Sequence, residues 1–159
     1  DTYPKSKYKD VVFSITHWPS FCPGIFDNEF HQDIFDNWIR EYKLFCEKNK
    51  FKDYQYAEIG KLFAHSIADQ DGIIPVKHIR KFIEEENNEE INRSFIVAEF
   101  NKRGVYTPDS GVTENRMAVE YLEMSKSLEN EFPICSSIYK SLSESYFSSS
   151  ERERKDDEI

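Results

Sequence analysis

Two aspartates and a glycine, in the run Asp69-Gln-Asp-Gly72, have the composition of the centre of a calcium-binding loop between two helices. In such a loop the glycine stands at position six, and oxygen-bearing side chains are required at positions one and twelve. With Gly72 at position six, position one is Ile67 and position twelve is His78, and neither supplies the oxygen. We therefore expect no calcium site, and we interpret the run as a polar turn that caps the following helix.

The histidines are the other residues whose type suits a metal site. Structural zinc sites show tightly paired ligands, such as two cysteines a few residues apart. Here Cys22 lies at wide spacing between His17 and His31. His65 and His78 flank the aspartate turn, so a metal site there would depend on the fold bringing them together. The spacing favours partly packed or surface histidines, and we expect no metal and no cofactor.

The three cysteines, Cys22, Cys46 and Cys135, are too few and too irregularly spaced for a disulfide framework. Reduced thiols of a cytoplasmic protein are the simpler interpretation. Cys46 and Cys135 fall within expected helices, which leaves Cys22 as the one thiol to test as a nucleophile. The chain has no nucleophile elbow, phosphate-binding glycine loop or dinucleotide fingerprint. We expect no catalytic residue and favour a non-enzymatic role.

The composition narrows the class of partner. The chain has 159 residues, with 30 acidic and 21 basic side chains and a formal net charge of −9. Nucleic-acid binding needs clustered Lys and Arg against phosphates, so this balance argues against it. No apolar run approaches the ~18 residues of a membrane span, so no membrane association is expected. Aromatic residues make up 15% of the chain, enough bulk for a core without disulfides or metals.

The chain divides by composition into three segments. Residues 1–26 are expected to be extended and irregular, with a β-branched run at 11–15 that favours one short strand. Residues 27–147 are expected to form a helical domain. The charged, serine-rich segment 148–159 is expected to be a tail, either a frayed helix or a disordered end.

Apolar residues recur at helical spacing through the central segment, and glycine and proline are few. We therefore predict an all-α fold, a compact bundle of about six helices ending in an antiparallel helical hairpin. The acidic run 84–90 is expected to be a solvated link between two of them. The expected helices begin after a cap at Asp27 or Asn28, after Asp53, at Pro75, near Ile91, after Thr113 as N-cap and at Pro133.

The loop from Glu99 to Thr113 carries the sharpest helix-stop and helix-start signals. Lys102 and Arg103 end one helical pattern, and Gly104 follows where a left-handed cap belongs. Such loops can be recognition surfaces, which makes three of its residues candidate interaction residues: Arg103, Tyr106 and Asp109. The structural alternative is that Arg103 meets the carbonyls of the preceding helix and Tyr106 packs on the hairpin. Trp18 and Trp38 are further candidates, because an exposed tryptophan would mark a docking face.

A set of short motifs is spread over residues 55 to 155: Ile59-Gly60, Asp71-Gly72-Ile73, Val76 to Ile83, Asn101-x-Arg103-Gly104-Val105, Glu120-Tyr121, Pro133, Ser145-Tyr146 and Glu151 to Glu153. Through these residues the stretch resembles an uncharacterised domain found at the C-terminal ends of bacterial proteins. In that family's pattern the loop often carries a second Arg and a Gly-Gly pair, where this chain has Thr107-Pro108 and Ser110-Gly111. The resemblance implies an all-α domain attached to a larger bacterial protein, and it implies no activity.

Two functions remain open from the sequence. The first is a non-catalytic protein-interaction or regulatory domain, the C-terminal part of a larger bacterial protein, which binds another protein or the rest of its own polypeptide. A first residue other than Met agrees with such a piece. The alternative is an effector or enzymatic subunit of a bacterial stress or anti-phage defence system, with a site near the Arg103–Thr113 loop. An exposed apolar patch would favour the first, and a deep pocket with convergent polar groups the second.

Overall fold

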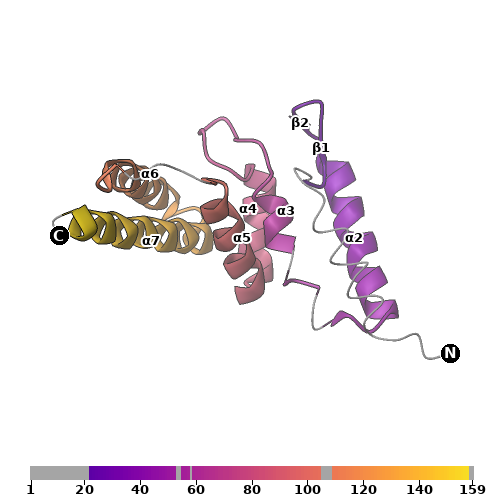
Figure 1. Cartoon of the computed structure of the whole chain (residues 1–159). Coiled ribbons are helices and arrows are strands. Elements are labelled where there is room, and N and C mark those ends of the chain that lie inside the picture. The colour runs from indigo at the N-terminus through magenta and orange to yellow at the C-terminus, as the bar shows by residue number, and fades with distance from the viewer. Residues whose placement is uncertain (1–21, 53–54, 58, 105–108, 158–159) are drawn as a thin grey trace.

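The computed structural model describes residues 22–52, 55–57, 59–104 and 109–157 (Figure 1). Helix α2 lies at one end of the molecule, α3 to α5 form the middle, and α6 and α7 form a hairpin at the other end. This arrangement confirms the predicted all-α bundle that ends in a helical hairpin. The elements are β1 (Ile25–Phe26), β2 (Glu29–Phe30), α2 (Gln32–Lys48), α3 (Ile59–Phe63), α4 (Lys77–Glu86), α5 (Glu89–Asn101), α6 (Val112–Leu128) and α7 (Pro133–Asp157).

A small β-hairpin precedes α2, where the sequence predicted the start of the first helix. Asp27 and Asn28 have positive φ angles of 52° and 63°, and they form the two-residue turn between β1 and β2. That geometry suits a primed hairpin turn, in which Asp and Asn are favoured. The prediction that either residue caps α2 was therefore wrong, because the same residue types serve caps and turns. The predicted strand at 11–15 lies outside the described residues.

Aromatic side chains attach α2 to the middle of the bundle. Phe35, fully buried, contacts Phe63 of α3 at 5.8 Å and Phe82 of α4 at 5.9 Å between ring centroids. Phe63 and Phe82 meet edge to face at 5.6 Å, which closes a triangle of rings. Lys43 of α2 pairs with Glu86 of α4 at the edge of this cluster. Part of the predicted apolar side of the first helix, including Phe35, Ile39 and Tyr42, is thus buried.

Glycine allows α3 to approach α5 closely. A Cβ at Gly60 would clash with the carbonyl of Ile91 and the hydroxyl of Ser94. The second helix is shorter than the sequence pattern predicted, because α3 spans only Ile59–Phe63. Its expected cap, Asp53, lies outside the described residues.

The turn at residues 69–72 caps α4, as the sequence predicted. Asp69 Oδ2 accepts a hydrogen bond from the backbone N–H of Lys77 at 2.7 Å, which satisfies one of the free donors at the start of the helix. Asp71 accepts two hydrogen bonds from Arg80, at 2.8 and 2.9 Å. Arg80 is completely buried and also donates to the carbonyl of Pro75 at 2.8 Å. The two aspartates thus bind protein groups.

Glu84 shows why the acidic run is not the solvated link that the sequence predicted. Helix α4 continues through Glu86, and the link is only Asn87, with φ of 44°, and Asn88, the N-cap of α5. The Glu84 carboxylate accepts hydrogen bonds from the backbone N–H groups of Ile134 and Cys135, at 3.1 and 2.8 Å. These are first-turn donors of α7, so an acid from one helix caps the next.

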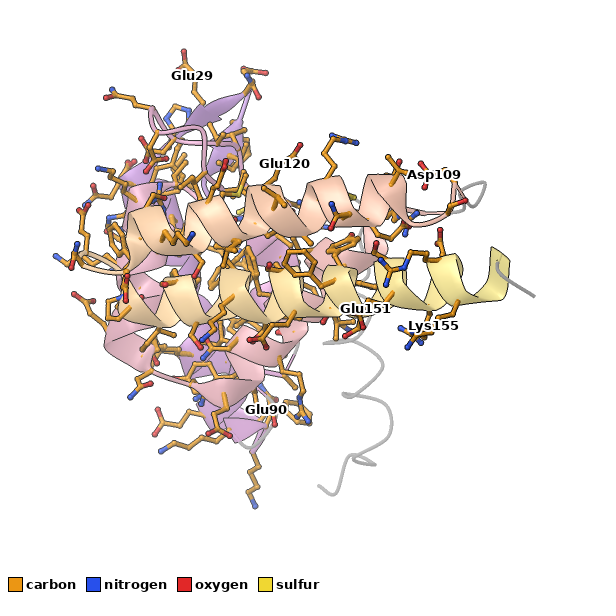
Figure 2. All side chains as sticks on the ribbon, turned by 90° about the vertical axis from the view of Figure 1, so that its left-hand side faces the viewer. Glu29, Glu90, Asp109, Glu120, Glu151 and Lys155 are labelled. Atoms are coloured by element: carbon orange, nitrogen blue, oxygen red, sulfur yellow. The ribbon has the colours of Figure 1, made fainter. Side chains whose placement is uncertain are left out.

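Helices α6 and α7 pack side by side along a seam of small residues (Figure 2). Hydroxyls of α7 donate across the seam to backbone carbonyls of α6: Ser136 to Ser125 at 2.8 Å, Ser143 to Ala118 at 2.7 Å and Ser150 to Gly111 at 2.8 Å. Small residues thus recur every seven positions on both helices, a pattern that allows close packing at a shallow crossing angle. This repeat was not predicted from the sequence.

Helix α7 extends beyond the boundary expected at residue 147. It continues through Asp157, so residues 148–157 are helical, in agreement with the helical alternative for the tail. None of the helices within the described residues has the length and apolar character needed to cross a membrane.

The first prediction concerns the seam. Ser143→Ala removes one buried hydroxyl and its bond to the Ala118 carbonyl, at an expected cost of about 1 kcal/mol in the free energy of unfolding. Ser143→Val also forces branched bulk between the helices and should cost about 2 kcal/mol more. Ser137, exposed on the same helix, is the matched control, and Ser137→Val should change stability by less than about 0.5 kcal/mol. Urea denaturation measures all three. Equal effects of valine at 143 and 137 would contradict the close packing.

The second prediction concerns acid stability. Backbone N–H groups of Lys77 and Gln70 lower the pKa of Asp69. Burial alone would raise the pKa of Asp71, but Arg80 and the N–H of Ile73 outweigh it, and that pKa is lowered too. A carboxyl group whose pKa is lower in the folded than in the unfolded protein stabilises the folded state. This stabilisation is complete above the unfolded-state pKa, about 3.9 for Asp, and it is lost as the pH falls through the folded-state pKa. The free energy of unfolding should therefore drop below about pH 4.

The variant Asp71→Asn tests this assignment. It should be less stable than wild type at pH 7 by about 2 kcal/mol, because the buried Arg80 loses its charged partner. Its loss of stability between about pH 4 and pH 2 should also be shallower. Glu123→Gln, at an exposed position of α6, should retain the wild-type pH dependence. Parallel pH profiles for Asp71→Asn and wild type would contradict the role of Asp71.

Candidate functional site

The loop between α5 and α6 carries the interaction residues predicted from sequence, and Arg103 is held there inside the fold. Its guanidinium pairs with the carboxylate of Glu114 on α6. The Arg103 side chain is 11% exposed and that of Glu114 is fully buried. A contact of Arg103 with carbonyls of the preceding helix stays a prediction. Arg103 thus joins the end of α5 to the start of α6. The backbone of Gly104 has φ of 65°, as expected for a left-handed cap.

Asp109 caps the start of α6. Its carboxylate accepts from the backbone N–H of Thr113, at 3.1 and 3.2 Å, and from the Thr113 hydroxyl at 2.6 Å. The hydroxyl and then the backbone N–H of Thr113 lower the pKa of Asp109. Thr113 lies inside the helix, whose N-cap position is Gly111. The prediction of Thr113 as N-cap was therefore wrong. The side chain that accepts the free N–H at the start of α6 belongs to Asp109, four residues before Thr113.

Three carboxylates gather at this end of the hairpin. Asp109, Glu114 and Glu153 each place an oxygen within 4.8 Å of the others. Figure 2 shows Asp109 at the start of α6, beside the last turns of α7, which carry Glu151 and Lys155. Glu153 accepts a hydrogen bond from the backbone N–H of Gly111 at 3.0 Å. Oxygen ligands in such a group suit Mg²⁺ or Ca²⁺ in principle.

Each of these carboxylates already has a hydrogen-bond donor or a cation of the protein as its partner. Asp109 and Glu153 accept backbone N–H groups at the start of α6, and Arg103 supplies the positive charge beside Glu114. Carboxylates at a helix N-terminus are stabilised there without a bound cation. We therefore interpret the three carboxylates as structural groups that hold the α5–α6 loop against the start of α6 and the end of α7.

A second buried acid lies one turn before Arg103. Glu99 is almost fully buried and pairs with Lys102, at 2.6 Å between Oε2 and Nζ. Lys102 also donates to the carbonyl of Ala64 behind α3. Burial, and then the Glu99 charge, raise the pKa of Tyr121, which stacks on Tyr146 at 5.5 Å between ring centroids. These groups pack α5 against the hairpin.

The structure describes only one of the three remaining predicted interaction residues. Trp18 and Tyr106 lie outside the described residues. Trp38 is half-buried on α2 and stacks on Tyr42 at 5.0 Å between ring centroids. A binding role for any of these residues, or for Arg103 and Asp109, stays a prediction.

The thiols and histidines are not assembled for catalysis in the described part of the chain. All three cysteines are buried and free of disulfides, and burial raises the pKa of Cys22 to about 12. A thiolate is the reactive form, so Cys22 has almost none at neutral pH. His65 is exposed, and His78 Nε2 lies 2.7 Å from Asp36 of α2. The histidines that flank the aspartate turn therefore do not share a metal site with it.

An apolar row on α2 is the feature that sequence reasoning passed over. Ile34 and Phe45 keep 41% and 37% of their surface exposed, and both belong to the stripe that the sequence assigned to the core. Leu44 on α2 and Phe26 in the β-hairpin are also exposed. The sequence carried a signal for this exposure, because the apolar stripe of this helix is wider than one neighbouring element covers.

The third prediction tests the buried ion pair. Arg103→Ala leaves the fully buried Glu114 without its cation and should lower the free energy of unfolding by about 3 kcal/mol. Arg103→Met combined with Glu114→Leu removes both charges and keeps the volume, so most of that stability should return.

The exposed pair Arg116–Glu120, at 3.0 Å on the same helix, is the control. Arg116→Ala should cost less than about 1 kcal/mol, because water screens an exposed pair. Urea denaturation curves give these values. If the double variant at 103 and 114 is no more stable than Arg103→Ala, the cost of Arg103→Ala does not come from leaving the buried Glu114 carboxylate unpaired.

Comparison of the chain with models of protein families, with curated proteins and with solved structures finds no match. The resemblance to a domain at the C-terminal ends of bacterial proteins therefore stays a prediction from the sequence. What can be inferred about function rests on the geometry of the described residues.

Proposed function

We propose that this chain is a non-catalytic protein-interaction domain, and that the outer face of α2 binds a helix of a partner protein. The observation that carries the proposal is the exposure of Ile34 and Phe45 on one side of that helix. The sequence alone had identified such a patch as the feature that would favour an interaction role over an enzymatic one.

The two side chains form a row because of helical geometry. Eleven residues separate them, which is about three turns of an α-helix, so they project from the same side. Glu41 lies between them, seven residues after Ile34 and four before Phe45. This spacing of 34, 41 and 45 follows the seven-residue repeat by which one helix packs along another. A helix is therefore the shape of partner that fits the row.

The charge of the row suggests what the partner carries. Glu41 is exposed and forms a loose surface pair with Arg40, at 3.7 Å between Oε1 and Nε. A partner helix with two apolar side chains and a Lys or Arg between them would complement Ile34, Glu41 and Phe45. Leu44 adds a further exposed apolar side chain on the same helix, and exposed aromatic and aliphatic anchors dominate the energy of many interfaces.

The alternative, an effector or enzymatic subunit with a site near the Arg103–Thr113 loop, has less support. In the described part of that loop the charged groups of Arg103, Asp109 and Glu114 are engaged in holding the fold. The buried cysteines offer no ready nucleophile. Their reduced state agrees with the cytoplasm, which we propose as the place where the interaction occurs.

The fourth prediction tests the α2 face with the full chain as bait in a lysate of its native host. Ile34→Glu combined with Phe45→Glu places two charges in the row and should abolish retention of a partner that the wild-type bait retains. Val119, 42% exposed on α6, is the matched control, and Val119→Glu should retain the partner. Circular dichroism should show the same helix content for all three baits.

The same partner should then bind the purified wild-type chain directly, and its binding segment should be helical. Undiminished retention by the Ile34/Phe45 variant would overturn the assignment of the α2 face. If the wild-type bait retains no protein more strongly than the Ile34/Phe45 variant does, the proposed function is overturned.

A further inference from the structure

A hollow of about 430 Å³ lies between α5 and α7. Ile96, Val97 and Phe100 of α5 form its apolar side. Asn101 of α5 and Ser148 and Arg152 of α7 add polar groups at its edge. This volume falls within the range of small-molecule sites, which combine an apolar lining with a few placed polar groups.

The apolar side of the hollow is open to solvent and firmly supported. Val97 keeps 45% of its surface exposed, although its neighbours on α5 pack into the bundle. Phe100 is half-buried, and its ring lies 4.8 Å from that of Tyr146, measured between centroids. A ligand that covers Val97 and the exposed edge of Phe100 would remove apolar surface from water without requiring the helices to move.

Arg152 supplies the charge. Its Nε donates to the carbonyl of Ser148 at 3.3 Å, and its Nη2 donates to the hydroxyl of Ser149 at 3.4 Å. Among the described residues, no carboxylate pairs with Arg152, although the chain carries an excess of acids. The backbone and hydroxyl contacts use part of the guanidinium, which has five N–H donors in a planar fork suited to oxyanions.

We propose that this hollow binds a small amphipathic anion, with its apolar body against Val97 and Phe100 and its carboxylate, sulfonate or similar oxyanion on Arg152. The amide of Asn101 and the hydroxyl of Ser148 also line the hollow and can donate to the remaining oxygen atoms. Charge complementarity determines which class of ligand the hollow prefers. An apolar surface alone would bind neutral and anionic molecules equally well, whereas the guanidinium favours a molecule with an anionic group at one end. The inference is independent of the α2 face and involves other residues.

The test uses two fluorescent probes that share their rings and differ in charge. 8-Anilino-1-naphthalenesulfonate carries a sulfonate, and N-phenyl-1-naphthylamine is its neutral counterpart. We expect saturable binding of the anionic probe to the full chain at one site. The neutral probe should bind more weakly, by about fivefold, because it lacks the charged contact. Decanoate, a carboxylate with an apolar chain, should displace the anionic probe.

Two pairs of variants locate the site. Arg152→Ala should weaken the anionic probe by about fivefold and leave the neutral probe unchanged, whereas Arg154→Ala, two residues along the same helix, should change neither. Val97→Asp should weaken both probes, and Val119→Asp, at a similarly exposed valine on α6, should affect neither. Urea denaturation confirms that each variant is folded.

Equal binding of the two probes, or an Arg152→Ala variant that binds the anionic probe like wild type, would overturn the proposal. So would anionic binding that Ile34→Glu with Phe45→Glu removes and Val97→Asp does not, because the probe would then lie on α2. Loss of a protein partner in the α2 experiment has no bearing on these outcomes, so the two proposals can fail separately.

Discussion

The buried guanidinium of Arg80 is the interaction on which the rest of the bundle depends. It draws the carboxylate of Asp71 and the carbonyl of Pro75 onto α4, and it lies 5.2 Å from the ring centroid of Phe132, just before α7. A cation without solvent contact is tolerated only when its donors are matched, so the loop before α4 must keep this shape. One turn later Glu84 caps α7. Two side chains of α4 therefore place the base of the hairpin.

The sequence predicted the helical architecture because it depends on local signals. Pro133 ends one helical pattern and begins the next, and Gly104 adopts the positive φ expected of it. The errors arose where one residue type serves two purposes. Asp27 and Asn28 suit a helix cap as well as a hairpin turn, and the acids around Glu84 suit water as well as a helix N-terminus. Only the tertiary contacts decide between these uses.

The candidate sites were less predictable, because exposure is a property of the assembled fold. Phe35 and Phe45 belong to one sequence stripe, yet the first is buried at the centre of a ring cluster and the second faces outward. Arg103 was predicted as an interaction residue, and the structure shows a pairing that the sequence did not reveal, with Glu114 eleven residues away across a loop. The hollow at Val97 and Arg152 joins two helices that are about fifty residues apart in the chain, a separation that periodicity cannot bridge.

The seam between α6 and α7 has a mechanical consequence. Serine hydroxyls of one helix hold backbone carbonyls of the other at three levels, from Ser136 near the base to Ser150 near the far end. Neither helix can bend or slide alone without breaking bonds to the other's main chain, so the hairpin behaves as a single stiff rod about 25 Å long. Its base rests on Glu84, and its far end carries Glu153 and the start of α6. A displacement of the far end would therefore be transmitted along both helices to the contacts that their base makes with α4.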